Sequence, residues 1–447
     1  MTDKKPTNPA SEGVMEKIIS LCKRRGFIYQ GSEIYGGLAG TWDYGPLGVA
    51  LKNNVKALWW KRFVETRDDM YGVDAAILMN QNAWKASGHV AGFSDPLVEC
   101  SKCKKRFRAD HLEDKKKCPE CGGALGSEKQ FNMMFKTNVG ATQDENSISY
   151  LRPETAQGMF VNFKNIIDSF HPKLPFGMAQ IGKAFRNEIA PRDFIFRTRE
   201  FEQMEIEYLV HPKEWKETFE HFVKQVHAWT SDIGLDPKHV HELEIADGDR
   251  AHYSKRTIDF EFDYPFGKKE LYGLAYRTDF DLKAHSDLSK VDLSYFDEET
   301  KERLIPHCIE PSFGVDRTVL AILSDAYTED ELGGEKRVYL KLSPNVAPYR
   351  VAVFPLLKNK PELVKKATEV YQLLKKELGK VTFDDNGNIG KRYRRQDEIG
   401  TPYCVTVDFD TIEKDSKVTV RDRNTGEQER VTLTELTAYL KEKCLRS

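Results

Sequence analysis

Charged side chains alternate with other residues along one segment of the sequence. Alternate positions there carry two cations, an aromatic ring, an amide and two carboxylates: Arg197, Arg199, Phe201, Gln203, Glu205 and Glu207. In a β-strand these side chains would project from one face, with Phe201 and Glu205 roughly 13 Å apart. That spacing matches the separation between the base and the far end of a small acyl nucleotide, so this face could hold both ends of one ligand. A solvent-exposed charged ribbon is the alternative interpretation.

The preceding segment could form the other arm of a long antiparallel hairpin. Residues 176–189 and 194–210 are extended, alternating stretches joined by residues 190–193. A turn centred between Arg192 and Asp193 would set Ala184 opposite Phe201. Because a small residue beside a ring leaves a slot for a base, this hairpin predicts a nucleotide site.

Four of the eight cysteines have the spacing of a zinc ribbon: Cys100, Cys103, Cys118 and Cys121. Two tight turns that each supply two thiolates predict a structural Zn²⁺ in an insertion over residues 98–125. With four protein ligands no coordination position stays open, so this metal would not be catalytic. His111 is an alternative ligand, and four free thiols in a metal-free loop are the alternative to a metal site.

Helices and antiparallel strands must position these residues. Apolar periodicity predicts helices over residues 14–25, 46–65, 153–170 and 212–233, and a strand over residues 73–79. Further strands are expected over residues 257–264, 270–278 and 305–314, the last running into a helix. This order of elements predicts an α+β fold with an antiparallel sheet flanked by helices rather than a repeating parallel unit.

A smaller unit is predicted after a linker at residues 333–348, which contain two glycines and two prolines. Beyond it we expect strands over 350–354, 380–384 and 403–408, helices over 361–378 and 389–398, a hairpin turning at 424–426 and a closing helix. The domains would therefore be a disordered arm over residues 1–13, a catalytic domain over 14–342 and an α/β domain over 343–447.

Several segments resemble the motifs of class II aminoacyl-tRNA synthetases. The segments FRNEI at 185–189 and REF at 199–201 resemble motif 2, EPSFGVDR at 310–317 resembles motif 3, and YGPLG at 44–48 with its helix resembles motif 1. The segments SGH at 87–89, RPETAQG at 152–158 and FEQMEIEY at 201–208 are similar to the glycyl branch. The resemblance implies the class II fold, ATP-dependent activation of glycine to glycyl-adenylate, and transfer of glycine to the 3′-terminal adenosine of tRNA(Gly).

The resemblance also implies roles for single residues. Arg186 at the α-phosphate, Arg317 at the terminal phosphate and Glu188 beside the nucleotide are the implied catalytic residues, with Mg²⁺ screening the phosphates. The implied ATP-binding residues are Arg186, Asn187, Glu188, Phe196, Arg197, Thr198, Arg199, Glu200, Phe201, Glu270, Leu271, Gly314, Val315, Asp316 and Arg317. The implied glycine-binding residues are Arg108, Glu154, Phe201, Glu202, Gln203, Met204, Glu205, Glu310, Pro311, Ser312, Phe313 and Gly314.

An assembly and an RNA-binding surface are implied as well. The family uses motif 1 for a two-fold interface, so a homodimer is expected. Its C-terminal domain binds the anticodon, and residues 389–395 and 400–403 fit such a domain. The cations around Tyr393 could there contact the RNA backbone and bases.

Composition limits the other possibilities. Sixty-eight Lys and Arg against 70 Asp and Glu give a net charge of −2, so RNA would be bound by local patches rather than a global basic field. The N-terminal residues are polar and no later stretch reaches the ~20 apolar residues that a membrane span needs. We expect a cytoplasmic protein with no membrane partner.

Two alternative functions are open at this stage. A non-catalytic relative that binds nucleic acid should lose the charged catalytic set, whereas Arg186, Glu188 and Arg317 are all present. Synthetases for serine, proline or threonine share the motif layout, but residues 152–158 and 203–208 favour glycine.

Overall fold

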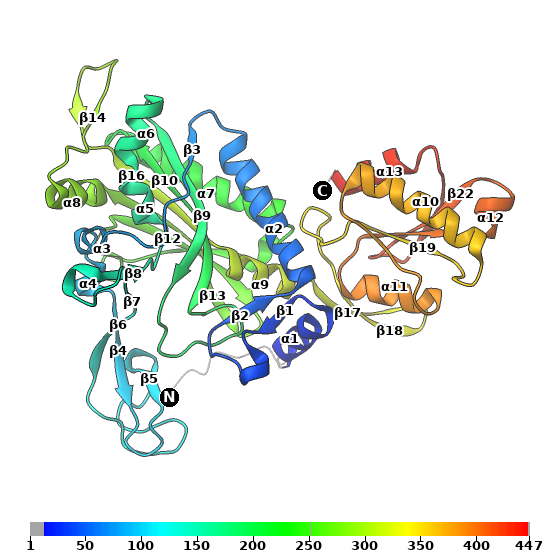
Figure 1. The fold of residues 1–447 in the computed structure, drawn as a ribbon, viewed down its shortest axis with the longest axis horizontal. Helices are drawn as coiled ribbons and strands as arrows, with labels where there is room; N and C mark the ends of the chain where they lie inside the picture. Colours follow the sequence, from blue (N-terminus) through cyan, green and yellow to red (C-terminus); the bar gives the residue numbers. More distant parts are fainter. Residues whose placement is uncertain (1–12, 252, 446–447) are drawn as a thin grey trace.

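The computed structural model describes residues 13–251 and 253–445 (Figure 1). The arm predicted over residues 1–13 lies outside this range except for Gly13, the residue that precedes α1 (Val14–Arg25). The larger unit is built on a seven-stranded sheet in the order β11-β12-β13-β16-β10-β9-β3. Its strands are β3 (Met70–Gly72), β9 (Phe176–Phe185), β10 (Glu200–Val210), β11 (Val240–Glu244), β12 (Arg256–Tyr264), β13 (Gly267–Thr278) and β16 (His307–Gly314).

The antiparallel sheet predicted from the sequence is confirmed. Every neighbouring pair of its strands is antiparallel except β3 with β9. Helices α2 (Pro46–Trp60), α7 (Trp215–Asp232) and α9 (Val315–Ala326) contribute to the main apolar core, together with Met204 and Ile206 of β10. Because side chains alternate along a strand, Glu205 and Glu207 project from the opposite face. One face of β10 therefore stabilises the fold and the other carries ionisable groups.

The predicted hairpin is present with the expected register. β9 and β10 pair along their length, and Ala184 lies opposite Phe201. Both strands are shorter than predicted, because β9 ends at Phe185 and β10 begins at Glu200.

Residues 186–199 form a loop between these two strands, and here the strand prediction was wrong. Pro191 has no amide hydrogen to donate to a partner strand. Asp193 and Phe194 adopt positive φ angles of 59° and 58°, which an extended strand does not contain. The alternation predicted for Arg197 and Arg199 therefore does not apply.

Helix predictions in the larger unit are mostly confirmed. α1 has the predicted bounds, and α2 continues into a π-helical turn at Lys61–Glu65 as far as predicted. The single helix predicted over 153–170 is instead two helices, α5 (Ala156–Phe160) and α6 (Phe163–Phe170). Asn162 lies at the break, where its side chain donates a hydrogen bond to the carbonyl of Gly158 at 2.8 Å.

The strand predicted over residues 73–79 is wrong. The strand in this region is β3, which ends at Gly72, and only the amide of Val73 continues its pairing by donating to Ala179. The carbonyl of Ala75 instead accepts a hydrogen bond from the guanidinium of Arg152 at 2.7 Å. A side chain from a distant segment thus replaces the strand partner.

The cysteine-containing insertion projects from the larger unit (Figure 1). Its sheet has the order β5-β4-β6, and a separate hairpin, β7–β8, follows. Short elements of this region and of the sheet's other end are β1 (Ile28–Gln30), β2 (Trp42–Tyr44), α3 (Gln81–Ala86), α4 (His89–Gly92), β4 (Ser94–Glu99), β5 (Arg106–Arg108), β6 (Lys129–Asn132), β7 (Phe135–Asn138), β8 (Ile148–Leu151), α8 (Phe280–Ser289), β14 (Tyr295–Phe296) and β15 (Arg303–Leu304).

The C-terminal unit is a small α/β fold with its own apolar core. Its five-stranded sheet has the order β20-β19-β21-β22-β23, with the first three strands parallel. Its elements are β19 (Val351–Pro355), α10 (Pro361–Leu378), β20 (Val381–Phe383), α11 (Ile389–Glu398), β21 (Tyr403–Val407), α12 (Phe409–Glu413), β22 (Lys417–Asp422), β23 (Gln428–Thr432) and α13 (Leu436–Leu445). The predictions for α10 and α11 are confirmed to the residue.

The first part of the predicted linker is wrong. β17 (Tyr327–Leu332) and β18 (Glu335–Leu340) form a hairpin whose turn contains Gly333 and Gly334, both at positive φ. Those glycines therefore serve a tight turn, and the chain passes between the units after Leu340. Among the helices of the described ranges, none has the length and apolarity needed to cross a bilayer.

Candidate active site

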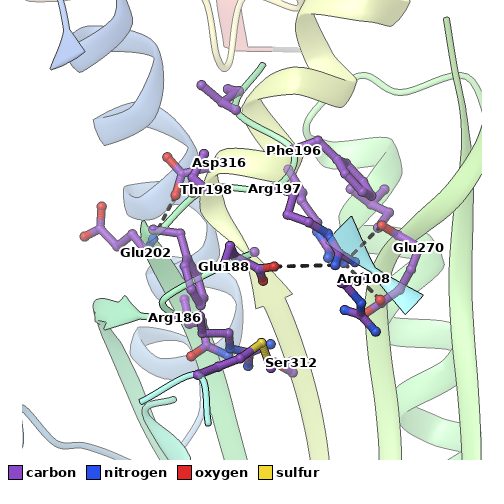
Figure 2. A pocket seen from close by; sticks show the side chains of 17 residues that line it. Arg108, Arg186, Glu188, Phe196, Arg197, Thr198, Glu202, Glu270, Ser312 and Asp316 are labelled. Atoms are coloured by element: carbon purple, nitrogen blue, oxygen red, sulfur yellow. Dashed lines mark hydrogen bonds and ion pairs between the residues drawn. The ribbon is translucent and has the colours of Figure 1, made fainter. Parts of the chain in front are cut away.

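A pocket lies between loop 186–199 and strands β10, β13 and β16 (Figure 2). It collects most of the residues that the family resemblance assigns to ATP: Arg186, Glu188, Phe196, Arg197, Thr198, Phe201, Glu270, Leu271, Gly314, Asp316 and Arg317. Arg108, Glu202, Gln203 and Ser312, which the resemblance assigns to glycine, line it as well. Residues far apart in the sequence thus share one cavity.

Two arginines from different elements line the pocket. The Arg186 guanidinium lies 5.3 Å from the ring centre of Phe201, and its Nε donates to the carbonyl of Pro153 at 3.0 Å. Arg317, near the start of α9, forms an ion pair with Glu270 at 3.0 Å and lies 4.5 Å from the ring of Phe196. Among the described residues no carboxylate forms an ion pair with Arg186, so its charge is available to an anionic ligand.

Loop 186–199 is fixed by its own side chains. Arg197 forms an ion pair with Glu188 at 3.5 Å within the pocket. Arg199 instead donates to the main-chain carbonyls of Glu188 at 3.1 Å and Ala39 at 2.7 Å. Arg199 therefore holds the loop, and its side chain is not part of the pocket lining.

Carboxylates gather beside Ser312 and Gln203. Glu205 is buried, and it accepts hydrogen bonds from Thr155 at 2.5 Å, Ser312 at 2.8 Å and Gln203 at 3.3 Å. These donors leave Glu205 acting as an acceptor throughout, as expected of an ionised carboxylate. The arrangement would suit a small cationic ligand group.

Glu154 lies against a histidine of the segment at 87–89. Its carboxylate contacts His89 Nε2 at 3.2 Å and accepts from Gln157 at 3.0 Å. Burial opposes its ionisation, but His89 and Arg277 together lower the pKa of Glu154 well below its usual value. Glu154 is therefore a second ionised carboxylate of this region.

Arg277 is a buried cation that binds the carboxylates of Asp281 and Glu310, and the sequence analysis did not predict this role. Its guanidinium donates to both oxygens of Asp281, at 2.7 and 2.8 Å, and to Glu310 at 2.6 Å. Its place in the sequence between Tyr276 and Thr278 gave no sign of this role, because its partners come from another strand and a helix.

Most of the remaining predicted residues lie outside the cavity wall, and Arg108 is the exception. Met204, Phe313 and Val315 belong to the apolar core, so only their main chain could contact a ligand. Glu200 is exposed and pairs with Lys183. Asn187 donates its main-chain amide to Met133 at 2.7 Å, and Pro311 lies opposite Leu274 in the sheet. Arg108 reaches the pocket from β5 and is held there by Asp95 and Asp110, each at 2.7 Å.

A buried ion-pair network connects α2 with the pocket. Lys52 contacts Glu202 at 3.0 Å and Asp316 at 3.3 Å, and Tyr44 donates to Asp316 at 2.5 Å. The main-chain amide of Glu202 also donates to Asp316, at 2.7 Å. Glu202 and Asp316 therefore support the neighbouring residues Phe201 and Arg317.

Replacement of Lys52 by methionine should lower the free energy of unfolding by about 3 to 5 kcal/mol, because it leaves the buried Asp316 without its cation and Glu202 with Lys56 alone. Chemical denaturation measures this change. Lys56→Met is the matched control, since Lys56 is more exposed and, among the residues that the structure describes, forms an ion pair with Glu202 alone; this substitution should cost about 1 kcal/mol or less. Equal losses from both substitutions would contradict the structural role of Lys52.

The four cysteines of the insertion form one cluster. Their sulfur atoms all lie within 4.8 Å of one another, with 3.5 Å between Cys100 and Cys121 and 3.7 Å between Cys103 and Cys118. A tetrahedral zinc with bonds of about 2.3 Å places its sulfur ligands about 3.8 Å apart. The cluster therefore fits a Zn²⁺ ion, and His111, the alternative ligand, is not part of it.

The cationic segment of α11 is partly buried within the C-terminal unit. Arg392 is buried and donates to the main-chain carbonyls of Pro355, Asp385 and Gly387. Arg394 pairs with Glu335, Arg395 pairs with Asp384, and the hydroxyl of Tyr393 contacts Thr406. Thr401 is likewise buried against Gln396. Arg392 and Thr401 thus stabilise the C-terminal unit, while Lys391 is exposed, so RNA contact by the other cations of this segment stays a prediction.

Comparisons with known proteins cover both units. The tRNA synthetase class II core domain (G, H, P, S and T) family matches residues 135–326, and the anticodon binding domain family matches residues 350–443. The glycine–tRNA ligase of Caldanaerobacter subterraneus subsp. tengcongensis is 50% identical over 96% of this chain and 98% of its own length. Those of Alkaliphilus oremlandii and Bacillus cereus are also 50% identical, over 97% and 96% of this chain and 99% of their own lengths.

The chain belongs to the glycine–tRNA ligase family. This confirms the family expected from the motifs, and the class II core confirms the expected fold. The core match begins at Phe135 and therefore leaves out α1, α2 and the cysteine cluster, whereas the glycine–tRNA ligase match extends over 96% of the chain.

Proposed function

We propose that this chain activates glycine with ATP in the pocket of Figure 2 and then transfers it to the 3′-terminal adenosine of tRNA(Gly). The observation that carries the proposal is the arrangement of Arg186, Phe201 and Arg317 in one cavity that also contains Ser312, the hydrogen-bond donor to Glu205. Cations for phosphates, a ring for a base and carboxylates for an ammonium group are the features that such a reaction needs.

The first chemical step would be attack of the glycine carboxylate on the α-phosphorus of ATP, with pyrophosphate as the leaving group. No general base is needed, because the carboxylate is already ionised. Arg186 would stabilise the α-phosphate and Arg317 the terminal phosphate, with Phe201 stacked on the adenine. Bound Mg²⁺ would screen the phosphate charges, and Glu270 is the carboxylate at that end of the pocket.

Glycine would be recognised by charge and by lack of space. Glu154, Glu205 and Glu310 would surround its ammonium group, and Ser312 would help to orient Glu205. Since glycine is the smallest amino acid, larger competitors can be excluded by bulk without an editing step. Arg277 packs against the ring of Tyr253 at 3.8 Å and supports one wall of this region.

An aminoacylation assay tests the complete reaction. Purified protein with ATP, Mg²⁺, bacterial tRNA and labelled glycine should produce base-labile glycyl-tRNA, and labelled serine should give none. Charging with serine but not glycine would instead favour another branch of the class II enzymes.

For the insertion we propose a structural Zn²⁺ held by Cys100, Cys103, Cys118 and Cys121. The ion would crosslink the two turns and so support β5, whose residue Arg108 reaches the pocket. We also propose domains over residues 14–342 and 343–447, and a cytoplasmic location.

Removal of zinc should loosen this insertion. We expect about one zinc per chain by elemental analysis, and chelation should increase proteolysis within residues 98–125 and weaken glycine activation. Cys103→Ser should reproduce both effects, whereas Cys22→Ser, in the buried core elsewhere, should change neither. Unchanged proteolysis in a metal-free preparation would contradict the proposal.

The homodimer expected from motif 1 is also a proposal. Apolar side chains are exposed near α2, including Ile34 at 88% and Tyr35 at 86% exposure. A second copy that covered this surface would remove them from water. Light scattering should give twice the chain mass of 51.4 kDa.

A further inference from the structure

Two buried glutamates face each other across the sheet behind the acidic region. The register of β10 and β16 pairs Glu205 with Ser312 and Tyr208 with Ile309, which sets Glu207 directly opposite Glu310. Glu207 is fully buried and Glu310 is 7% exposed. Two ionised carboxylates in such positions would repel each other at short range and away from water.

Among the described residues, Arg277 is the buried cation that forms ion pairs with this cluster, and it is committed to other groups. Arg277 binds Glu310 with one nitrogen and Asp281 with two others, so it compensates charge on those partners. Glu207 receives a hydrogen bond from the Cys308 thiol to its Oε2 at 2.9 Å. Within the described residues, its Oε1 is buried and has no hydrogen-bond donor. An ionised Glu207 would therefore carry an uncompensated charge.

The acidic groups packed around Glu207 favour a neutral acid, whereas Arg277 opposes it. β10 itself contributes Glu205, β16 contributes Glu310 and Cys308, and β13 contributes Arg277, whose charge is shared with Asp281 of α8. Glu154 adds a further negative charge nearby. Burial raises the pKa values of both Glu207 and Glu310 well above their usual range, and the ion pair with Arg277 at 2.6 Å makes Glu310 the partner that keeps its negative charge.

We propose that Glu207 is a positioning residue of the amino-acid pocket, which as a neutral carboxylic acid donates a hydrogen bond from Oε1 to Glu310. One carboxylate oxygen from each of Glu205, Glu207 and Glu310 lies within 4.8 Å of the others, so the three groups form one cluster. The bond fixes the carboxylate of Glu310 for the ammonium group of glycine. This inference rests on the proposed function of the pocket.

The proton on Glu207 also sets the charge of the site. Glu205 and Glu310 then provide the negative charge that binds the ammonium group, while Glu207 provides a donor. A glutamine at position 207 has the same shape and also donates, through its amide nitrogen. It can therefore replace a neutral glutamic acid but not an ionised glutamate.

The test is the glycine KM in ATP–pyrophosphate exchange, with the ATP KM measured in parallel. Glu207→Ala should raise the glycine KM about tenfold to a hundredfold, with the ATP KM nearly unchanged, because a buried hydrogen bond to a charged group is lost. Glu207→Gln should keep the glycine KM within about threefold of the wild-type value. Glu205→Gln is the same substitution at a neighbouring glutamate of the same strand, and it should raise the glycine KM at least about thirtyfold.

Two results would overturn this role: a glycine KM raised as much by Glu207→Gln as by Glu205→Gln, or an alanine variant that activates glycine normally. Because the glutamine variant preserves shape, it decides the question even if the alanine variant does not fold. If the wild-type chain itself fails to exchange with glycine, the proposed function of the pocket is rejected, and the role of Glu207 with it.

Discussion

Replacement of Arg186 by alanine is expected to reduce glycine-dependent ATP–pyrophosphate exchange by about 10² to 10³-fold. The guanidinium lines the pocket beside Phe201 without a carboxylate partner among the described residues, so its charge is available to the phosphate that reacts. Because negative charge increases on that phosphate in the transition state, the main loss should be in kcat.

Arg192→Ala is the matched control for this prediction. Arg192 belongs to the same loop, but its side chain is 48% exposed, and within the described part of the chain its ion pair is with Asp193 at 3.4 Å. This variant should exchange within about twofold of the wild-type rate, as is usual for surface substitutions. An Arg186 variant that retains a tenth or more of the wild-type activity would show that the α-phosphate is stabilised elsewhere.

Glu205→Gln should raise the glycine KM at least about thirtyfold and leave the ATP KM nearly unchanged, because a buried charge pair with the substrate is lost. Thr155, Ser312 and Gln203 hold the carboxylate in place, so the amide can adopt its position but lacks its charge. The exchange assay at varied glycine and saturating ATP measures the effect.

Glu242→Gln provides the control on the edge strand of the same sheet. Glu242 is exposed on β11 and pairs with His227 at 2.6 Å, far in the strand order from the pocket. Its glycine KM should stay at the wild-type value. If both variants bind glycine normally, the ammonium group is not bound at Glu205.

Local sequence patterns predicted the helices whose ends are marked by capping residues. α1 ends at Gly26, which adopts the positive φ of a helix C-cap, and α11 begins after Asn388, whose side chain accepts from the amide of Lys391. The register of the hairpin was also predictable, because the loop is symmetric about residues 192 and 193.

Elements that depend on distant side chains were not predictable. Residues 73–79 have a strand-like composition, but the guanidinium of Arg152 binds the carbonyl of Ala75, and this contact joins segments far apart in the sequence. For the same reason Arg392 looked like an RNA contact, although its partners are carbonyls of its own domain.

The motif resemblance predicted the pocket residues, but it did not distinguish residues that line the cavity from residues that hold the lining residues in place. Phe201, Arg186 and Arg317 line the cavity, as implied. The motifs assigned no role to Lys52, Arg277 or Glu207, and their importance follows from burial and from the carboxylates around them.

The central claim is tested most directly by ATP–pyrophosphate exchange with purified protein and Mg²⁺, run separately with glycine, alanine, serine, proline and threonine. Our account predicts rapid exchange with glycine and none above background with the other four. Exchange with serine, proline or threonine instead of glycine, or with no amino acid at all, would contradict it.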